Sequence, residues 1–167
     1  MLLYHGSNVA VEKPRLLNQT RGLDFGSGFY LTTSEEQASR FSDIIVRRRK
    51  EGEATVSVYE LNLSDMESTL SIKRFESADS DWLGFVAENR LKTYSGPVYD
   101  IVIGAVANDI VMPTIQAYLG GFINEEATLI TLKASNLVDQ YCLKTEKALA
   151  LLQFVESYEA GGGSTRG

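Results

Sequence analysis

The chain has 167 residues, of which 44% are hydrophobic and 23% charged, a composition typical of a globular domain with its own core. The net charge of −6 argues against strong sequence-independent binding to nucleic acid or to an anionic membrane. His5 and Cys142 are the only residues of their types. A zinc site of mixed His and Cys ligands and an internal disulfide are therefore excluded, and we expect no metal cofactor.

The sequence gives no sign of a membrane segment, because no apolar stretch approaches the roughly 20 residues that span a bilayer. The N-terminus also lacks the basic start and apolar run of a signal peptide. We therefore expect a cytoplasmic protein with no membrane partner. One domain is predicted over residues 1–159, followed by a flexible Gly/Ser tail over residues 160–167.

The first third of the chain predicts two short strands and one helix. Residues 2–5 and 29–33 are β-prone runs, and the glycine-rich turn 24–28 leads into the second run. Ser34 followed by Gln37 is a capping box, which predicts a helix that ends in the basic run at residues 47–50.

The remaining pattern predicts four more strands separated by helices. We expect strands at 55–63, 70–75, 99–104 and 137–143, and helices at 81–93, 110–119, 124–133 and after Thr145. The last helix would carry Ala148, Leu151, Leu152 and Val155 on one face. Because strands and helices do not alternate regularly, the sequence favours an α+β fold.

Two segments carry the residues suited to ligand binding. Tyr4-His5-Gly6-Ser7 ends the first strand, and Gly26-Ser27-Gly28-Phe29-Tyr30-Leu31-Thr32 leads into the second. Glycine permits close approach of a ligand to the backbone, and a neutral imidazole offers one donor and one acceptor. Together with the Tyr30 ring, these groups suit a flat, polar aromatic ligand such as a nicotinamide.

These segments resemble the ADP-ribosyltransferase superfamily, in the histidine–tyrosine branch of diphtheria toxin and the poly(ADP-ribose) polymerases. A closer likeness is to an uncharacterised, toxin-like bacterial group within it. That group shares the two segments, Tyr99 to Asp109, a Gln in a late strand and the helix start Thr145 to Leu149. The resemblance implies a split β-sandwich of two small sheets with surrounding helices, and NAD in the cleft between them.

The resemblance also assigns roles to single residues. His5 would bind the ribose on the adenosine side of NAD, the Gly6 backbone would hold the carboxamide, and Tyr30 and Phe41 would stack on the nicotinamide ring. For Phe41, packing in the core is an equally good interpretation. The implied NAD-binding set is His5, Gly6, Ser7, Gly28, Tyr30 and Phe41, and the implied catalytic set is Tyr30, Gln140 and Asp109.

Gln140 stands where many members of the superfamily have a catalytic Glu, and an amide cannot act as a general base. Three interpretations remain open. Gln140 suffices if the target supplies its own nucleophile, Asp109 or Asp100 provides the carboxylate, or the domain binds NAD without transferring it. Asp109 equally resembles a helix N-cap.

Three further polar residues are expected to be structural. Arg21 and Asp24 are interpreted as turn and surface residues rather than as phosphate or target contacts. Cys142 is interpreted as a small buried side chain.

The resemblance implies mono-ADP-ribosyl transfer from NAD to a macromolecular acceptor, by the toxin of a pair that includes a small antitoxin protein. NAD hydrolysis and a catalytically silent NAD-binding or partner-binding module are the alternatives.

Overall fold

The structure is a computed structural model that describes residues 1–17, 22–64 and 67–161. Arg21 and residues 162–167 of the predicted tail lie outside the described residues. The elements, in chain order, are β1 (Leu2–Ser7), β2 (Phe29–Thr32), α1 (Glu35–Arg49), β3 (Thr55–Leu61), η1 (Glu67–Thr69), β4 (Ile72–Arg74), α2 (Ser80–Arg90), β5 (Ile101–Ala105), α3 (Met112–Leu119), α4 (Glu125–Ala134), β6 (Asp139–Leu143), α5 (Glu146–Leu149) and β7 (Leu152–Glu159).

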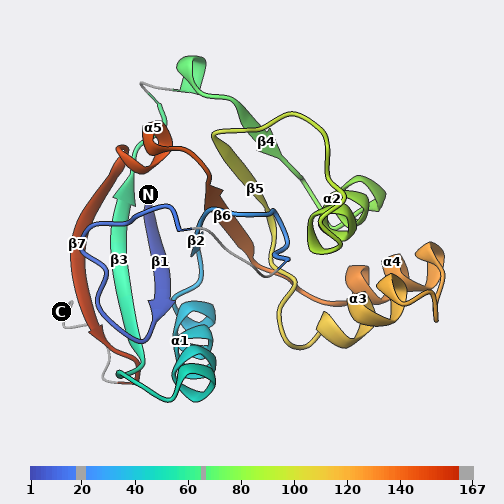
Figure 1. The fold of residues 1–167 in the computed structure, drawn as a ribbon, viewed down its shortest axis with the longest axis horizontal. Coiled ribbons are helices and arrows are strands. Elements are labelled where there is room, and N and C mark those ends of the chain that lie inside the picture. Colours follow the sequence, from blue (N-terminus) through green and yellow to red (C-terminus); the bar gives the residue numbers. More distant parts are fainter. Residues whose placement is uncertain (18–21, 65–66, 162–167) are drawn as a thin grey trace.

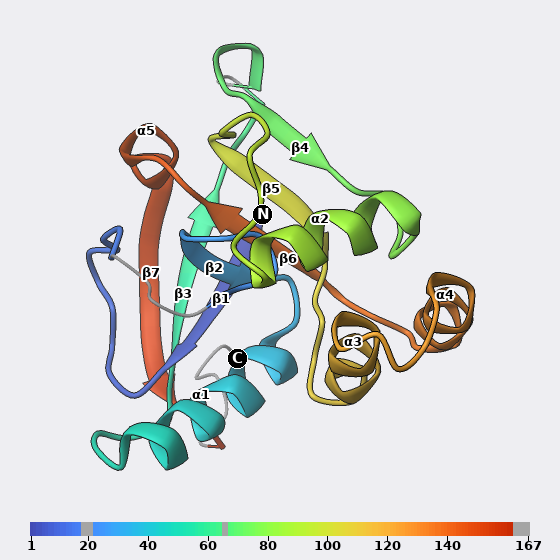
Figure 2. The ribbon, with the colours of Figure 1, turned by 45° about the vertical axis from the view of Figure 1, so that its right-hand side comes forward.

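The strands form one seven-stranded sheet in the order β4-β5-β6-β2-β1-β3-β7, shown in Figure 1. The sheet is mixed, because β4 and β5 are parallel while all other neighbours are antiparallel. Helices α1, α2, α3 and α4 lie along the same side of this curved sheet in Figure 2. The predicted α+β class is therefore confirmed.

The sheet has a weak point between β1 and β2. These strands share one residue pair, Tyr4↔Thr32, whereas β1 pairs with β3 over six residues from Leu2 to Ser7. The structure therefore has one continuous sheet where two small sheets were expected, and the β1–β2 pairing is where β4-β5-β6-β2 joins β1-β3-β7. We call Tyr4, His5, Tyr30 and Thr32 the β1–β2 junction.

The two faces of the sheet bury different side chains, because successive residues of a strand point to opposite sides. One cluster lies against α2, α3 and α4 and includes Phe25, Trp82, Val102 and Cys142. The other lies on the opposite face and includes Leu3, Phe29, Leu31, Tyr59, Ile101, Ile103, Tyr141 and Leu143. All five residues of β5 are buried, as its apolar sequence predicts.

Helix α1 begins as its capping box predicts. The Ser34 hydroxyl accepts a hydrogen bond from the backbone N–H of Gln37 at 3.1 Å. The helix packs against β1 so closely that a Cβ on Gly6 would lie 2.1 Å from the Ala38 carbonyl oxygen. Gly6 is thus the residue that lets α1 reach β1.

The predicted last helix is wrong beyond its first turn. Thr145 caps the helix as expected, but α5 ends at Leu149 and the chain continues as β7, so β6 is not the last strand. β7 pairs antiparallel with β3 along its whole length, with a bulge beside Val58 and Tyr59. Pairing with β3, about a hundred residues earlier, overrides the local apolar spacing.

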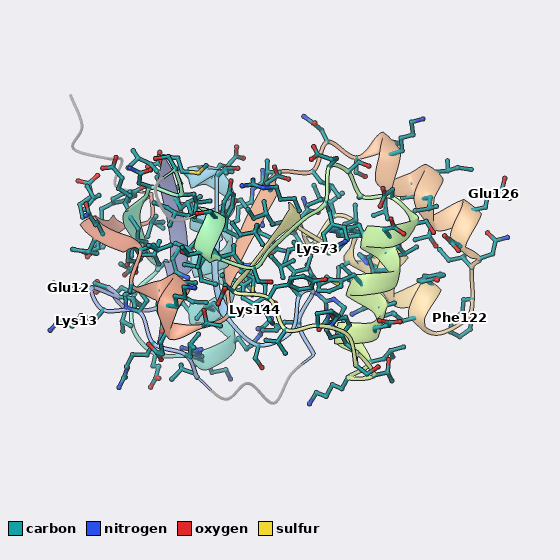
Figure 3. All side chains as sticks on the ribbon, turned by 90° about the horizontal axis from the view of Figure 1, so that it is seen from above. Glu12, Lys13, Lys73, Phe122, Glu126 and Lys144 are labelled. Carbon is teal, nitrogen blue, oxygen red and sulfur yellow. The ribbon has the colours of Figure 1, made fainter. Side chains whose placement is uncertain are left out.

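Helices α3 and α4 form a hairpin at one end of the molecule, with Phe122 and Glu126 at its tip in Figure 3. The split by Gly120-Gly121 is as predicted. Within the described residues, no helix has both the length and the apolar character needed to cross a membrane.

Candidate functional site

His5 links the two predicted ligand-binding segments across the β1–β2 junction. Its Nδ1 lies 2.7 Å from the Tyr30 carbonyl oxygen, and its ring stacks on Phe29 with 4.3 Å between centroids. A carbonyl can only accept, so Nδ1 carries the proton and donates it, and Nε2 is left as an acceptor in the neutral ring.

The environment of His5 favours this neutral form. Burial lowers the pKa of the imidazole below its usual 6.5, the hydrogen bond to the Tyr30 carbonyl opposes that shift, and the positive charge of Arg49 adds to it. The side chain is nonetheless only partly buried. His5 can therefore accept a hydrogen bond from a ligand hydroxyl through Nε2 near neutral pH.

Tyr30 lies on the opposite face of the sheet from His5, and its phenol anchors the glycine-rich turn before β2. The hydroxyl donates to the Gly26 carbonyl at 2.5 Å and accepts from the backbone N–H of Phe25 at 3.0 Å. Burial, together with nearby Cys142 and Asp24, raises the pKa of the phenol well above its ordinary value. Tyr30 is therefore a neutral, partly buried residue that keeps its phenolic proton in the hydrogen bond to the Gly26 carbonyl.

Gln140 lies on β6 directly opposite Thr32 of β2, two positions from the partner of Tyr30. The strand order β6-β2-β1 thus places Gln140, Tyr30 and His5 on three neighbouring strands. The Gln140 side chain is buried, and its Nε2 donates to Asp24 Oδ2 at 3.1 Å and to the Ala105 carbonyl at 3.4 Å.

Asp24 is a buried hub, so its interpretation as a surface residue is wrong. The residue is 6% exposed, and its carboxylate accepts hydrogen bonds from three separate parts of the chain. Arg90 of α2 contacts Oδ1 through Nε at 2.6 Å and also through Nη2, and the backbone N–H of Ala107 reaches Oδ2 at 3.1 Å. The carboxylate beside Gln140 therefore belongs to Asp24.

The two other candidate carboxylates lie elsewhere. Asp109 is exposed in the turn after β5, where Asn108 accepts the hydrogen bonds from the Ile110 and Val111 N–H groups. Asp100 precedes β5, at the opposite end of that strand from Gly104, the partner of Gln140. Hydrogen bonds from Ser71 and Thr145 lower the pKa of Asp100.

Three of the predicted NAD-binding residues have packing roles in the described structure. The Cα of Gly6 faces α1, and a Cβ on Gly28 would lie 2.4 Å from the Cys142 sulfur. The Ser7 hydroxyl is buried and donates to Asn8 Oδ1 at 3.4 Å. In each case the close neighbour of these residues is another part of the chain.

Phe41 does not pack in the core. Its side chain is 42% exposed on α1, one residue before Ser42, which is fully buried. The interpretation of Phe41 as a core residue is therefore wrong, and its ring remains available to a ligand. Cys142 is fully buried as predicted, and burial raises the pKa of its thiol to about 12.

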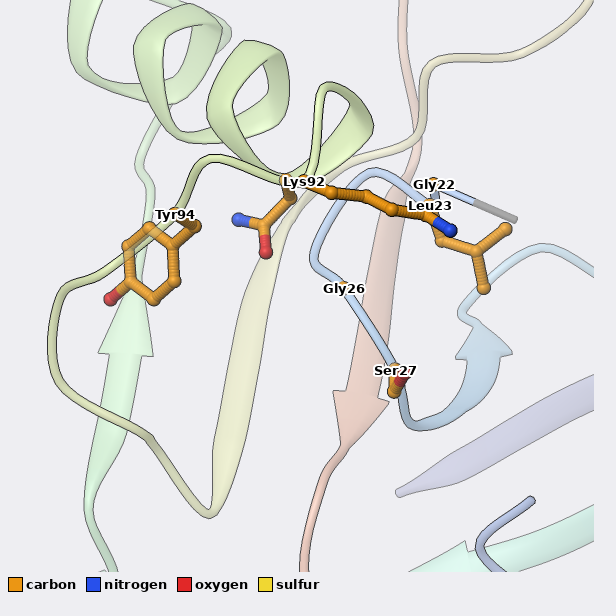
Figure 4. A pocket seen from close by; sticks show the side chains of 7 residues that line it. Gly22, Leu23, Gly26, Ser27, Lys92 and Tyr94 are labelled. Atoms are coloured by element: carbon orange, nitrogen blue, oxygen red, sulfur yellow. The ribbon is translucent and has the colours of Figure 1, made fainter. Parts of the chain in front are cut away.

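A polar cavity of about 240 Å³ lies beside the glycine-rich turn, and Figure 4 shows its lining. The lining residues come from the turn and from the end of α2: Gly22, Leu23, Gly26, Ser27, Asn89, Lys92 and Tyr94. The Lys144 Nζ donates hydrogen bonds to the Phe25 and Ser27 carbonyls of this turn, both at 2.6 Å, and so fixes its backbone. None of the predicted NAD-binding residues lines this cavity.

Sequence reasoning missed Asp24 and Arg90. Asp24 bonds to residues 66, 83 and 116 positions away, and no local pattern reports such pairs. The available signal was the position of Asp24 between the apolar residues Leu23 and Phe25, directly before the Gly-x-Gly segment.

The chain belongs to the family described as "Protein of unknown function (DUF3990)", whose profile matches residues 1–154. The match covers β1 to the first residues of β7, and thus every residue of the candidate site. No curated protein and no solved structure matches the chain significantly.

Proposed function

We propose that this protein binds NAD at the β1–β2 junction and transfers its ADP-ribose to a macromolecule, with a fold of the ADP-ribosyltransferase type. The observation that carries the proposal is the hydrogen bond from His5 Nδ1 to the Tyr30 carbonyl at 2.7 Å. It brings together two segments that resemble the NAD-binding motifs of that superfamily, and Gln140 lies one strand further along.

The residues at the junction fit a dinucleotide with a flat, polar ring. His5 Nε2 accepts a hydrogen bond from a ribose hydroxyl, because Nδ1 is already committed as a donor. The partly exposed Tyr30 and the exposed Phe41 offer aromatic surface for the nicotinamide ring. The resemblance assigns the carboxamide to the Gly6 backbone, which lies two residues beyond the single Tyr4↔Thr32 pair of β1 and β2.

The reaction needs little acid–base chemistry. The bond between C1′ and the nicotinamide nitrogen breaks, and its electron pair leaves with neutral nicotinamide. A lone pair of the acceptor then forms the new bond to C1′, and the acceptor's proton is released to water. Gln140 accepts a hydrogen bond from the ribose and cannot deprotonate the acceptor, so the acceptor supplies its own nucleophile.

The likeness to a toxin-like group supports a wider proposal, that the transferase is a toxin held inactive by a small antitoxin protein. This step rests on analogy. The acceptor is a macromolecule whose nucleophile attacks C1′ without a general base from the enzyme.

A catalytically silent NAD-binding module is the second candidate, and one observation favours it. The carboxylate of Asp24 is fully engaged by Arg90, Ala107 and Gln140, so it is not free to act as the general base that a catalytic Glu would supply.

Incubation of the purified protein and a cell lysate with NAD labelled in the adenylate half separates these functions. Label on a macromolecule, lost in Phe41→Ala but retained in the exposed control Phe122→Ala, supports the transferase. Free labelled ADP-ribose indicates a glycohydrolase, and binding without turnover indicates the silent module. No binding and no turnover contradict the whole proposal.

A further inference from the structure

We propose that Asp24 positions Gln140, so that the Gln140 carbonyl oxygen faces the ligand and position 140 cannot carry an ionised carboxylate. The inference deepens the proposed function and rests on it, because the ligand group received by Gln140 is a ribose hydroxyl of NAD. The contact between Asp24 and Gln140 is tested without NAD.

The orientation of the Gln140 amide follows from its neighbours. The two atoms within hydrogen-bond distance are Asp24 Oδ2 at 3.1 Å and the Ala105 carbonyl oxygen at 3.4 Å, and both can only accept. The amide nitrogen must therefore face them, and Oε1 must point away.

The carbonyl oxygen of Gln140 is the part left for a ligand. In the described part of the chain, every fully buried side-chain nitrogen or oxygen has a hydrogen-bond partner. The hydrogen bonds of Gln140 all leave from Nε2, so Oε1 is not completely enclosed even though the residue is only 7% exposed. A carbonyl oxygen without an internal donor can accept a hydrogen bond from a ligand hydroxyl, which a ribose provides.

Asp24 cannot turn away to accept a different donor. Oδ1 is held by two guanidinium nitrogens of Arg90, and Oδ2 by the Ala107 N–H as well as by Gln140. A neutral amide at position 24 would face its own NH₂ group toward at least one of these donors. The network therefore requires a carboxylate at 24 and a donor at 140.

This arrangement explains why position 140 carries Gln. A carboxylate there would lie about 3 Å from Asp24 Oδ2 in a buried site, where two like charges cannot both ionise. One of the two groups would stay protonated well above its usual range.

The test is the melting temperature of Gln140→Glu between pH 5 and pH 8, relative to wild type. Because the introduced carboxyl has a raised pKa in the folded state, the unfolded chain loses its proton first as pH rises above about 4.3. The difference in melting temperature between variant and wild type should be smallest at pH 5 and about 5 °C larger at pH 8. Gln116→Glu, an exposed position on α3, should show no such trend.

The double variant Asp24→Asn with Gln140→Glu should lose the trend with pH, because only one carboxyl remains. A melting profile of Gln140→Glu that parallels wild type at every pH would overturn the proposal, even if Asp24→Asn fails to fold. If the trend appears but wild type neither binds nor consumes NAD, the contact stands and the proposed function fails.

Discussion

The two edges of β2 differ in how completely they pair with the neighbouring strands. Toward β6, all four residues of β2 have partners, from Phe29↔Leu143 to Thr32↔Gln140, and the buried contacts of Asp24 lie behind this pairing. Toward β1 there is one residue pair and one hydrogen bond from the His5 side chain. β2 is thus paired along its whole length with β6 and at a single residue pair with β1.

The difference has a physical reason. Unpaired backbone beside a sheet must find other partners, and a side chain or a ligand can supply them. On the β6 side the partners are internal, so the groups are saturated and buried. On the β1 side His5 is only partly buried and Phe41 of α1 is exposed, and we expect a ligand to bind on this side.

Asp24→Asn disrupts the buried contacts on the β6 side of β2 and should have the largest effect on the free energy of unfolding. Loss of the buried charge leaves Arg90 without its partner and should lower the free energy of unfolding by about 3 kcal/mol. This value is the lower end of the usual cost of breaking a buried ion pair, because the Arg90 side chain is 22% exposed. Urea titration measures the loss. Asp100→Asn, which removes the charge and one of two acceptor oxygens in one exposed and one partly buried hydrogen bond, should cost about 1 kcal/mol.

Gly6→Ala tests the support of β1 on the open side. The new Cβ would lie 2.1 Å from the Ala38 carbonyl oxygen and 2.9 Å from the Ser42 nitrogen, so α1 must shift away. We expect a loss of about 2 kcal/mol in thermal unfolding. Gly84→Ala in α2 is the matched control, because a Cβ there meets nothing within 4 Å and should stabilise the helix. Equal effects of the two changes would contradict the packing described.

His5→Ala removes the side-chain link of the junction. Loss of the hydrogen bond to Tyr30 and of the stacking on Phe29 should cost about 1.5 kcal/mol. His5→Asn keeps a donor on a shorter side chain and should cost less. Chemical denaturation of both variants checks the order.

The lowered pKa of His5 also predicts how stability depends on pH. The unfolded chain takes up a proton at about pH 6.5, and the folded chain only at lower pH. The contribution of neutral His5 is therefore complete above about pH 6.5 and is lost as the pH falls toward its folded-state pKa. The free energy of unfolding of His5→Asn should depend less on pH than that of wild type between pH 6.5 and 5. Identical pH profiles of the two proteins would exclude His5 as the source of the dependence.

Phe41→Ala should have the smallest effect on folding and a clear effect on ligand binding. Because the ring is 42% exposed and outside the core clusters, the expected loss of stability is below about 0.5 kcal/mol. NAD affinity, measured by calorimetry, should fall about tenfold as stacking is lost. An unchanged NAD affinity would indicate that the ligand does not contact Phe41 of α1.

The residues of α1 and β7 show what sequence reasoning can reach. The start of α1 depends on Ser34 and Gln37, three residues apart, and was predicted correctly. The spacing of Leu152 and Val155 predicts a helix where β7 lies, because it fits a helical face as well as a strand, and only the pairing with β3 decides between them. The contact between Asp24 and Gln140 cannot be predicted from local sequence either, because the two residues are 116 positions apart.

The most direct test of the account is an NMR titration of His5, whose imidazole is the only one in the chain. We predict a single signal with a pKa below 6.5, in the Nδ1–H tautomer, that shifts when NAD is added and shifts less in Phe41→Ala. An imidazole with an ordinary pKa, whose signal NAD leaves unchanged, would contradict both the geometry of the junction and its role as the NAD site.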